Sequence, residues 1–415
     1  MGDSTRQYDI IVFGATGYTG KYACEHIVTS FPTDLKWAVA GRSRNKLQAV
    51  VDELKTLNAD RTPPAIEESS LDAAQLSALV RKTKVLLTTV GPYAKFGTPV
   101  VKACVENGTH YFDVTGESPW VRETIDNFHE KAKANKVIVI PQIGMDSAPA
   151  DLLTWSLVTH LRRTVNEPTK DVNFTLHSIK SRPSGGTLAS LLGLFDTYSL
   201  SDVGKSMKPW SLSPVAPGPS SSGASIAQSL TGVKVVRDLG TLTTSLQGAV
   251  DRTQVYRSWG LIDAGKFYGP AFRYHPFMTV RNVFVGFIVH SLLALGGLAL
   301  LLPPVRWVLK SIVYAPGQGP TKEEVKSDHI EYRAIATADS TDPSQPKRAF
   351  GRFAFEGSAY HMTGIFLAEA AMSLLKDDSL AKKMGGGVLT PATLGEGYVE
   401  RLQKAGFKLE LRTMA

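Results

Sequence analysis

Cysteine is nearly absent from this chain, which has only Cys24 and Cys104 among its 415 residues. Both lie in apolar helical patterns, as small core residues of a protein in a reducing compartment do. Two isolated cysteines exclude a disulfide framework. No Cys/His cluster has the spacing of a metal site, so no metal is expected. The first strand pattern begins at Tyr8, and we therefore expect no secretory signal peptide and no secretion.

Long runs of one charge are also missing. The net charge of +8 comes from basic residues spread along the chain, so nucleic acid is not an expected partner. A composition of 43% hydrophobic and 20% charged residues is ordinary for a globular protein. The length predicts two domains or one elaborated domain.

Two catalytic signatures are absent. No Tyr is followed four positions later by Lys, the pair of the short-chain dehydrogenases, and there is no G-x-S-x-G elbow. The histidines at positions 110, 177, 275 and 361 are scattered, which favours structural roles. Glu117 and Asp146 follow predicted strands, where a carboxylate more often caps a backbone amide than acts in catalysis. The catalytic residues therefore stay unassigned.

What is present is a glycine-rich turn near the start of the chain. Residues 10–13 form a short apolar, β-branched run of the kind found in a central parallel strand. The glycines that follow permit a tight turn, a close approach to phosphate and close packing of a helix on the strand. The free N–H groups of that helix would face a pyrophosphate. The expected cofactor contacts of the turn are Gly14, Thr16, Gly17, Tyr18 and Gly20.

The G-x-x-G-x-x-G spacing is a weak signal by itself, and a βα turn without a nucleotide is the alternative. Its position after a strand and before a helix favours dinucleotide binding. An NAD site usually places an Asp or Glu about 20 residues further on, and this chain has Arg42 and Ser43 there, close to Arg44 and Lys46. A guanidinium group pairs well with the 2′-phosphate, so we predict NADP(H). The alternative is a solvated basic helix start.

Strands and helices alternate through residues 1–150, which predicts an α/β fold with a Rossmann-type doubly wound parallel sheet. Ligands of such sheets bind at the carboxyl ends of the strands. The second domain, residues 151–380, is predicted to be α+β, with strands at 329–338 and 348–356. Residues 212–227, rich in Pro, Ser and Gly, are interpreted as a flexible loop. Residues 381–415, a helix and a tail, are expected to pack back on the first domain.

An apolar segment at residues 283–302 contains no charged side chain. As one helix it would be about 30 Å long, the thickness of the bilayer core. Arg281 precedes it, and Arg306 and Lys310 follow. A buried core helix is the alternative. If both flanks belong to one folded domain, insertion into one face of a membrane is more consistent than a span.

Seven short stretches together resemble the saccharopine dehydrogenase-like oxidoreductases, which include bacterial trans-acting enoyl reductases and eukaryotic lipid-droplet members. The resemblance covers nearly the whole chain and is weakest at 195–320. It implies a Rossmann domain, a second α/β domain and a nicotinamide cofactor, with Gly91 and Pro92 beside the nicotinamide half. The stretches are GATGYTG at 14–20, AGRS at 40–43, VGPY at 90–93, YFDVTGE at 111–117, GMDSAPAD at 144–151, SGGT at 184–187 and GGVLTPA at 386–392.

The leading hypothesis is an NADP(H)-dependent reductase of an apolar, acyl or polyketide-like substrate, with enoyl reduction as its most specific form. It would work at the cytoplasmic face of a membrane or lipid droplet, with a polyketide synthase or acyl carrier as candidate partner and a homodimer as candidate assembly. One alternative is an imine or carbonyl reductase or dehydrogenase of amino-acid-like substrates. Another is a lipid-droplet protein that binds NADPH without turnover.

Overall fold

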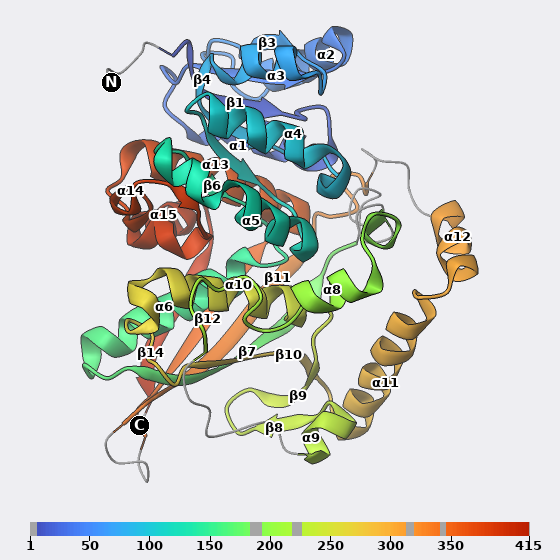
Figure 1. Ribbon diagram of the computed structural model, residues 1–415, viewed down its shortest axis with the longest axis vertical. Helices are drawn as coiled ribbons and strands as arrows, with labels where there is room; N and C mark the ends of the chain where they lie inside the picture. Colours follow the sequence, from blue (N-terminus) through green and yellow to red (C-terminus); the bar gives the residue numbers. More distant parts are fainter. Residues whose placement is uncertain (1–5, 183–192, 218–225, 313–318, 341–345, 415) are drawn as a thin grey trace.

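The computed structural model describes residues 6–182, 193–217, 226–312, 319–340 and 346–414. Two seven-stranded sheets organise these residues, one in the upper and one in the lower half of Figure 1. The stretch at 184–187 that contributes to the family resemblance lies outside the described residues.

The first sheet is parallel throughout, in the order β13-β6-β5-β4-β1-β2-β3. The chain starts at the centre, moves to one side through β2 and β3, and then returns to the other side through β4. This is a Rossmann-type doubly wound order, as predicted. The strands are β1 (Tyr8–Phe13), β2 (Trp37–Gly41), β3 (Ala65–Glu68), β4 (Thr83–Thr88), β5 (His110–Asp113), β6 (Ile138–Ile140) and β13 (Gly387–Val388).

Helices cover both faces of this sheet because β1 is apolar on both sides. Ile10 and Val12 pack with helices α1, α2 and α13, whereas Ile11 and Phe13 pack with α3, α4 and α5. The helix bounds are α1 (Tyr18–Ser30), α2 (Arg44–Lys55), α3 (Ala73–Val80), α4 (Tyr93–Glu106), α5 (Ser118–Ala134) and α13 (Ala359–Lys376).

The second sheet is mixed, in the order β14-β12-β11-β7-β10-β9-β8, and only the β10–β7 pair is parallel. The predicted strands at 329–338 and 348–356 are β11 and β12. The strands are β7 (Thr169–Lys180), β8 (Lys234–Val236), β9 (Gly240–Thr244), β10 (Arg273–Val280), β11 (His329–Ala338), β12 (Arg348–Glu356) and β14 (Lys408–Met414).

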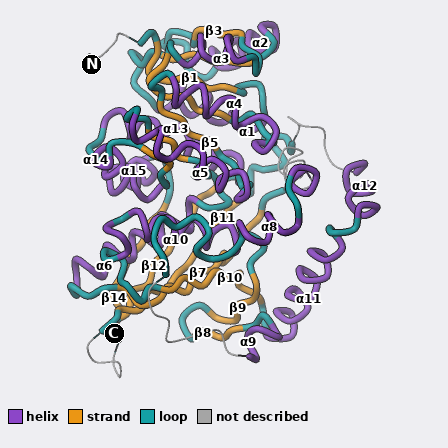
Figure 2. The backbone as a smooth tube through the Cα atoms, viewed as in Figure 1, coloured by secondary structure: helices purple, strands orange, loops and turns teal. Residues whose placement is uncertain are grey.

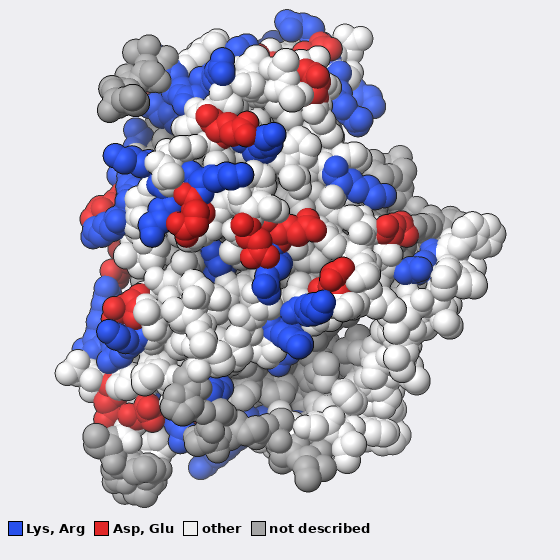
Figure 3. All heavy atoms as spheres, viewed as in Figure 1, with Lys and Arg blue, Asp and Glu red and all other residues white. Residues whose placement is uncertain are grey.

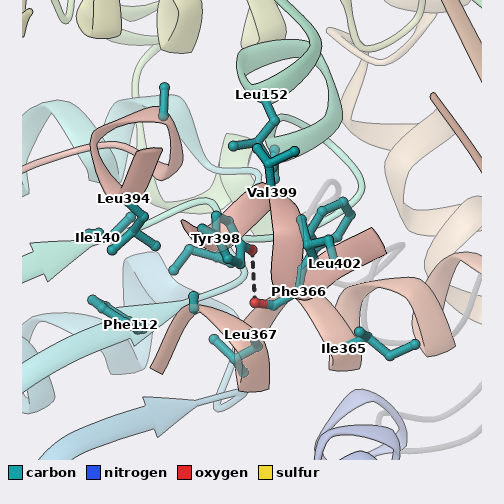
Figure 4. Close-up of a cluster of buried hydrophobic side chains, with 14 of the residues drawn as sticks. Phe112, Ile140, Leu152, Ile365, Phe366, Leu367, Leu394, Tyr398, Val399 and Leu402 are labelled. Atoms are coloured by element: carbon teal, nitrogen blue, oxygen red, sulfur yellow. Dashed lines mark hydrogen bonds between the residues drawn. The ribbon is translucent and has the colours of Figure 1, made fainter. Parts of the chain in front are cut away.

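Helices α6 (Ala148–Thr164) and α10 (Gly248–Leu261) cross the middle of the molecule and cover one face of the second sheet (Figure 2). A continuous core joins this layer to the first domain. Figure 4 shows its centre, where side chains of the first sheet, α6, α13 and α15 (Gly395–Lys404) meet, and where the Tyr398 hydroxyl donates to the Phe366 carbonyl at 2.8 Å. Shorter helices are α8 (Leu200–Ser206), α9 (Ile226–Thr231), α14 (Leu380–Met384) and the 3-10 turns η1 (Asp263–Gly265) and η2 (Pro391–Leu394).

The C-terminal segment divides between the two sheets. Strand β13 extends the first sheet beside β6, but the tail strand β14 pairs with β12 of the second sheet. The expectation that the whole tail packs on the first domain is therefore wrong for β14. Its alternating sequence from Lys408 to Met414 suits an edge strand, and β12 offers a free edge.

The expected loop at 212–227 is only partly described. Leu212 is buried, and the carbonyl of that residue accepts a hydrogen bond from Arg257. Residues 218–225 lie outside the described residues, and α9 begins at Ile226.

The apolar segment is not one helix of 20 residues, as the sequence had suggested. Helix α11 ends at Ala299, and α12 (Pro303–Ile312) begins at the two prolines. Proline lacks the N–H that would continue a helix, so a break at Pro303 and Pro304 is the expected result. Among the described residues, no single helix is long and apolar enough to cross a membrane. Only α11 and α12 taken together, bent by 104°, meet that length and composition.

We expect Asp151→Asn to gain stability relative to the wild type as the pH rises. Burial raises the pKa of Asp151 to about 7. Hydrogen bonds donated by the Ser258 hydroxyl and the Ala392 N–H lower the pKa and so oppose part of this shift. The ordinary value is 3.8, so the native state keeps this proton after the unfolded state has lost it. The wild-type free energy of unfolding should therefore fall between about pH 4 and about pH 7.

The amide side chain of asparagine does not ionise in this pH range, so the variant does not lose stability in this way. The stability difference between variant and wild type should move in favour of the variant by roughly 2–4 kcal/mol across that window. Denaturant unfolding at several pH values measures this difference. A difference that does not change with pH would contradict the prediction.

Candidate functional site

The glycine-rich turn lies where the strand order of the first sheet reverses, between β1 and β4. This switch point is where doubly wound folds bind their ligands. Gly14 has a φ of +94°, and a Cβ there would lie 2.8 Å from the Thr89 hydroxyl. That hydroxyl donates to the Gly14 carbonyl at 3.1 Å and so ties the end of β4 to the turn. Sequence reasoning missed Thr89, because its contact lies 75 residues away from Gly14.

The N-terminus of α1 is open to an anion. Gly17 is its N-cap, no side chain caps it, and its first turn contains no acidic residue. Free backbone N–H groups and the positive end of the helix dipole therefore face this position. Gly20 packs so closely on the turn that a Cβ would overlap the Gly14 carbonyl. The turn thus has the shape and the donors that a pyrophosphate requires.

Two other residues of the turn have different surroundings. Thr16 is half-buried within it. The hydroxyl of Tyr18 donates to the Pro320 carbonyl at 2.7 Å, and Gly319 lies against the Tyr18 ring. The phenol is therefore engaged by a segment 302 residues away. The backbone N–H of Tyr18, the first residue of α1, stays available to a phosphate.

Arg42 and Ser43 follow β2, next to the end of β1. Arg42 is exposed, and no ion pair or hydrogen bond engages its guanidinium group among the described residues. The Ser43 hydroxyl caps α2 by accepting from the Lys46 N–H at 3.5 Å, and its own proton stays available to a ligand. The first turn of α2 contains no acidic residue. These groups fit the extra phosphate that distinguishes NADP(H) from NAD(H).

We expect Arg42→Asp to weaken NADPH binding at least about 100-fold while NADH affinity changes less than about threefold. The substitution removes a bidentate phosphate donor and adds repulsion, each worth about 1–3 kcal/mol. Cofactor fluorescence titrations measure both constants. Arg44→Asp, one residue further into the exposed start of α2, is the charge-matched control. Equal losses for the two cofactors would contradict the assignment of Arg42.

Gly91 and Pro92 lie at the end of β4, on the other side of the switch point. Pro92 is the N-cap of α4. The two carboxylate oxygens of Glu117 accept from the backbone N–H groups of Tyr93 and Ala94, at 2.9 and 2.8 Å. The N-terminus of α4 is thus already occupied by an anion from the protein. Glu117 is a cap, as favoured by its sequence context, and α1, whose N-terminus has no side-chain cap, stays the predicted phosphate site.

Asp146 behaves differently from Glu117. It follows β6, is half-buried, and accepts at Oδ1 from the side-chain amide of Gln247 at 2.7 Å. The interpretation of Asp146 as a cap of a backbone amide is therefore wrong. Gln247 precedes α10, 101 residues further along the chain, and no local sequence signal joins the two. Burial raises the pKa of Asp146, and the bond from Gln247 opposes that shift.

Asp113 ends β5 and is fully buried. Its Oδ1 accepts from the N–H groups of Thr115 and Gln142, at 2.9 and 3.0 Å. It joins the loops after β5 and β6 on the cofactor side of the sheet. Burial raises the pKa of Asp113 to about 7, and these two bonds reduce that shift.

Helix α11 exposes an apolar surface at the edge of the molecule. Gly286 and His290, one turn apart, face β9, where they bond to Thr243 and Thr244 at 2.8 Å each. Most of the large side chains around the rest of the helix are exposed. Within α11 only Gly286 is buried, so the interpretation as a core helix is wrong. We call the following residues the apolar ridge: Val283, Phe284, Phe287, Ile288, Leu292, Leu295, Leu298, Leu301, Leu302, Trp307, Val308 and Leu309.

The apolar ridge has almost no charge beside it. In Figure 3 the edge of the molecule formed by α11 and α12 is nearly all white, whereas the rest of this face carries mixed charges. Phe284 is 72% exposed, Leu292 63% and Trp307 75%. Monomeric soluble proteins rarely expose so many large apolar side chains together, so this surface indicates a binding function.

Comparison with known proteins identifies the family. Residues 10–140 match the model described as "Saccharopine dehydrogenase NADP binding domain". The matched region contains the glycine turn and the Arg42 position, and its cofactor is NADP(H). The fold of the whole chain is similar to apo saccharopine dehydrogenase (L-Glu forming) from Saccharomyces cerevisiae. The TM-score is 0.60 at 12% identity, covering 98% of this chain and all of that one.

Relatives in sequence extend over the full length. A protein of Mycobacterium bovis named "Trans-acting enoyl reductase" is 31% identical, covering 98% of both chains, and one of that name from Mycobacterium leprae is 30% identical, again covering 98% of both. A Mycobacterium tuberculosis protein, named as a candidate trans-acting enoyl reductase, is 32% identical, and the match covers the full length of both chains. The chain therefore belongs to the saccharopine dehydrogenase-like oxidoreductases, the family that includes the trans-acting enoyl reductases.

Proposed function

We propose that the protein is an NADPH-dependent reductase of the C=C bond of an apolar acyl or polyketide-like substrate, and that it works at a membrane or lipid-droplet surface. The observation that carries the proposal is the apolar ridge, exposed on the same chain as an NADP(H) site. A soluble dehydrogenase of a polar amino acid has no need of such a surface. The names of the full-length relatives support the enoyl reaction.

The bent pair of helices suits insertion into one leaflet better than a span. With a bend of 104° between them, α11 and α12 would both be able to lie along the boundary between headgroups and acyl chains. From residue 264 to residue 322 the sequence contains no Asp or Glu, while Arg281, Arg306 and Lys310 flank the apolar run. A segment that has basic residues at its flanks and no carboxylates is expected to bind the anionic lipids of a cytoplasmic leaflet. The proposed location is therefore the cytoplasmic face of a membrane or lipid droplet.

The substrate would arrive from the apolar surface or from a carrier. Reduction requires a hydride, which the nicotinamide supplies when the cofactor is bound. The protein must hold the reacting carbon near the switch point and keep water away from it. An acyl carrier protein or polyketide synthase is the proposed donor of a trans-acting reductase, and a homodimer is the proposed assembly.

Substrate-dependent oxidation of NADPH by the purified full-length protein tests the reaction. The probes are a trans-2-enoyl, a 3-keto and a saturated thioester of pantetheine with the same medium-length chain, together with a cyclic imine. Oxidation with the enoyl probe alone is the expected result. Turnover of only the keto or imino probe would favour the carbonyl or imine reductase. Tight NADPH binding with no oxidation of any probe would favour a non-catalytic cofactor-binding protein.

A further inference from the structure

A group of buried polar side chains lies behind Asp146, where α10 meets the second sheet. Gln247, which bonds to Asp146, is the N-cap of α10. Asp251 follows it by four residues, so the two side chains lie on one face of the helix. The Asp251 side chain is buried, and no hydrogen bond engages its carboxyl group in the described part of the chain. Asp251 therefore lies one helical turn below the contact between Gln247 and Asp146.

The second sheet brings two phenols to the same place. Tyr274 of β10 pairs with Val172, and Tyr332 of β11 pairs with Leu176, so both share the sheet face of Phe174. The ring of Phe174 lies between them, with centroid distances of 5.8 Å to Tyr274 and 5.4 Å to Tyr332. This face is the one that α10 and α6 cover.

These side chains are buried without partners. The hydroxyls of Tyr274 and Tyr332 and both side-chain polar atoms of Gln254 have no hydrogen-bond partner among the described residues. Tyr332 is 2% exposed and Gln254 is 1% exposed. Each such atom destabilises the fold, because it gives up its hydrogen bonds to water. Four such atoms on α10 and the sheet face that it covers indicate a functional site, because apolar residues would serve stability better.

The charges of the two carboxyl groups act on one another and on the phenol of Tyr332. Burial, and then the Asp146 carboxylate, raise the pKa of Asp251 well above its ordinary value. Burial, and then Asp251 and Asp146, raise the pKa of Tyr332. The other charged groups acting here are Asp151 of α6 and Arg252 of α10, which influence Tyr274. Burial raises the pKa of Asp146 as well, so the environment favours the protonated form of both carboxyl groups.

We propose that Asp146, Asp251 and Tyr332 form the proton-donating site of the reductase, with Asp146 facing the substrate and the other two behind it. The inference rests on the proposed function and assigns the second half of that reaction. Asp146 lies after β6 beside Gly116, where its Oδ2 is 3.2 Å from the position of a Cβ on that glycine. It is the only member of the three that is not fully buried. The substrate class is an acyl thioester or ketone whose C=C bond is conjugated with the carbonyl group.

The proposed reaction adds one hydride and one proton across the C=C bond. Hydride addition at the β-carbon breaks the C=C π bond and leaves its electron pair on the α-carbon and carbonyl oxygen. The O–H bond of Asp146 then breaks, and its proton forms the C–H bond at the α-carbon. The Asp146 carboxylate regains a proton from Asp251, which water reprotonates. The unpartnered hydroxyl of Tyr332 would donate a hydrogen bond to a carboxylate that becomes charged during this transfer. Asp251 and Tyr332 are thus positioning residues.

The test uses the full-length chain, NADPH and the enoyl pantetheine probe. We expect Asp146→Asn to lower kcat about 100-fold, within the range of general acid catalysis, with NADPH affinity unchanged. Asp251→Asn and Tyr332→Phe should each lower kcat about tenfold at nearly constant KM and enlarge the solvent deuterium isotope effect. In heavy water, one deuterium should enter at the α-carbon. Tyr268→Phe removes a buried, unpartnered hydroxyl whose charged neighbour is Asp151, and it should change neither quantity.

A measurement without substrate separates this inference from the proposed function. The infrared difference spectrum of the free wild type minus free Asp251→Asn at neutral pH should show a neutral-carboxyl band, from which the other buried carboxyl groups cancel. If Asp146→Asn keeps kcat within about twofold, the site is not the proton donor. If the wild type reduces no probe, the proposed function fails, and the infrared band alone decides whether the pair holds a proton. Absence of that band overturns the inference.

Discussion

Replacing Gly20 by alanine is expected to abolish measurable NADPH binding and to destabilise the protein by about 2–4 kcal/mol. A Cβ at this position would overlap the Gly14 carbonyl and lie 2.9 Å from the Thr89 hydroxyl and 3.0 Å from the Ala15 Cα. Two of these three neighbours are backbone atoms, so relief requires α1 to move away from β1. That movement removes the N–H groups of the helix from the phosphate position. Calorimetric titration with NADPH and denaturant unfolding measure the two effects.

Gly17→Ala is the matched control, because the two glycines have different surroundings. A Cβ on Gly17 meets the Gly14 carbonyl at 3.2 Å and the Thr89 hydroxyl at 3.9 Å, which small adjustments can relieve. Its stability should stay within about 1 kcal/mol of the wild type, while NADPH affinity falls at least about tenfold, because the methyl group occupies space that the phosphate needs. Full NADPH affinity in Gly20→Ala would refute the placement of the pyrophosphate.

Charging the apolar ridge is expected to remove the protein from lipid surfaces. The double variant Leu292→Glu and Leu295→Glu replaces two side chains that are each 63% exposed. Each leucine withdrawn from the bilayer loses about 1.5–3 kcal/mol of apolar burial, and the carboxylates add repulsion from anionic lipids. Binding to phosphatidylcholine vesicles containing phosphatidylserine should fall at least about 100-fold in a flotation assay. NADPH affinity should not change, since α11 lies far from the glycine turn in Figure 1.

The control substitution is Leu57→Glu, at an exposed leucine just after α2 that is 44% exposed and outside the apolar ridge. It should leave vesicle binding within about twofold of the wild type. Undiminished flotation of the double variant would contradict the lipid-surface proposal. If the wild type itself does not float but forms a stable dimer that the double variant disrupts, the apolar ridge is a subunit interface instead.

Local patterns predicted much of the fold. The apolar run of β1, the glycine spacing and the alternation of strands and helices all act within about 30 residues, the scale of a βαβ unit. The bounds of β11 and β12 follow from runs of alternating and β-branched residues that end at turn-forming residues. Arg42 and Ser43 could be proposed as phosphate contacts for the same reason, because their distance from the glycines is set by one helix and one strand.

Other strands gave little local signal. Strand β3 has only four residues, three of them half-buried, and β8 has three. Strand β10 contains Pro276, and proline is disfavoured in the interior of a sheet because it lacks an N–H. It nevertheless pairs in parallel with β7 on one side and antiparallel with β9 on the other. Tertiary pairing overrides such short or interrupted patterns because the partner strands satisfy the backbone.

By itself, the sequence determined the parallel Rossmann sheet, the position of the phosphate turn and the preference for NADP(H). Each depends on residues close in the chain, whose geometry is fixed by one turn or one helix. Only the tertiary structure decided that Asp146 reaches Gln247, that the Tyr18 hydroxyl is held by Pro320, and that α11 turns its leucines outward. These features arise from contacts between segments about 40 to 300 residues apart and from what packing leaves uncovered, neither of which a local pattern encodes.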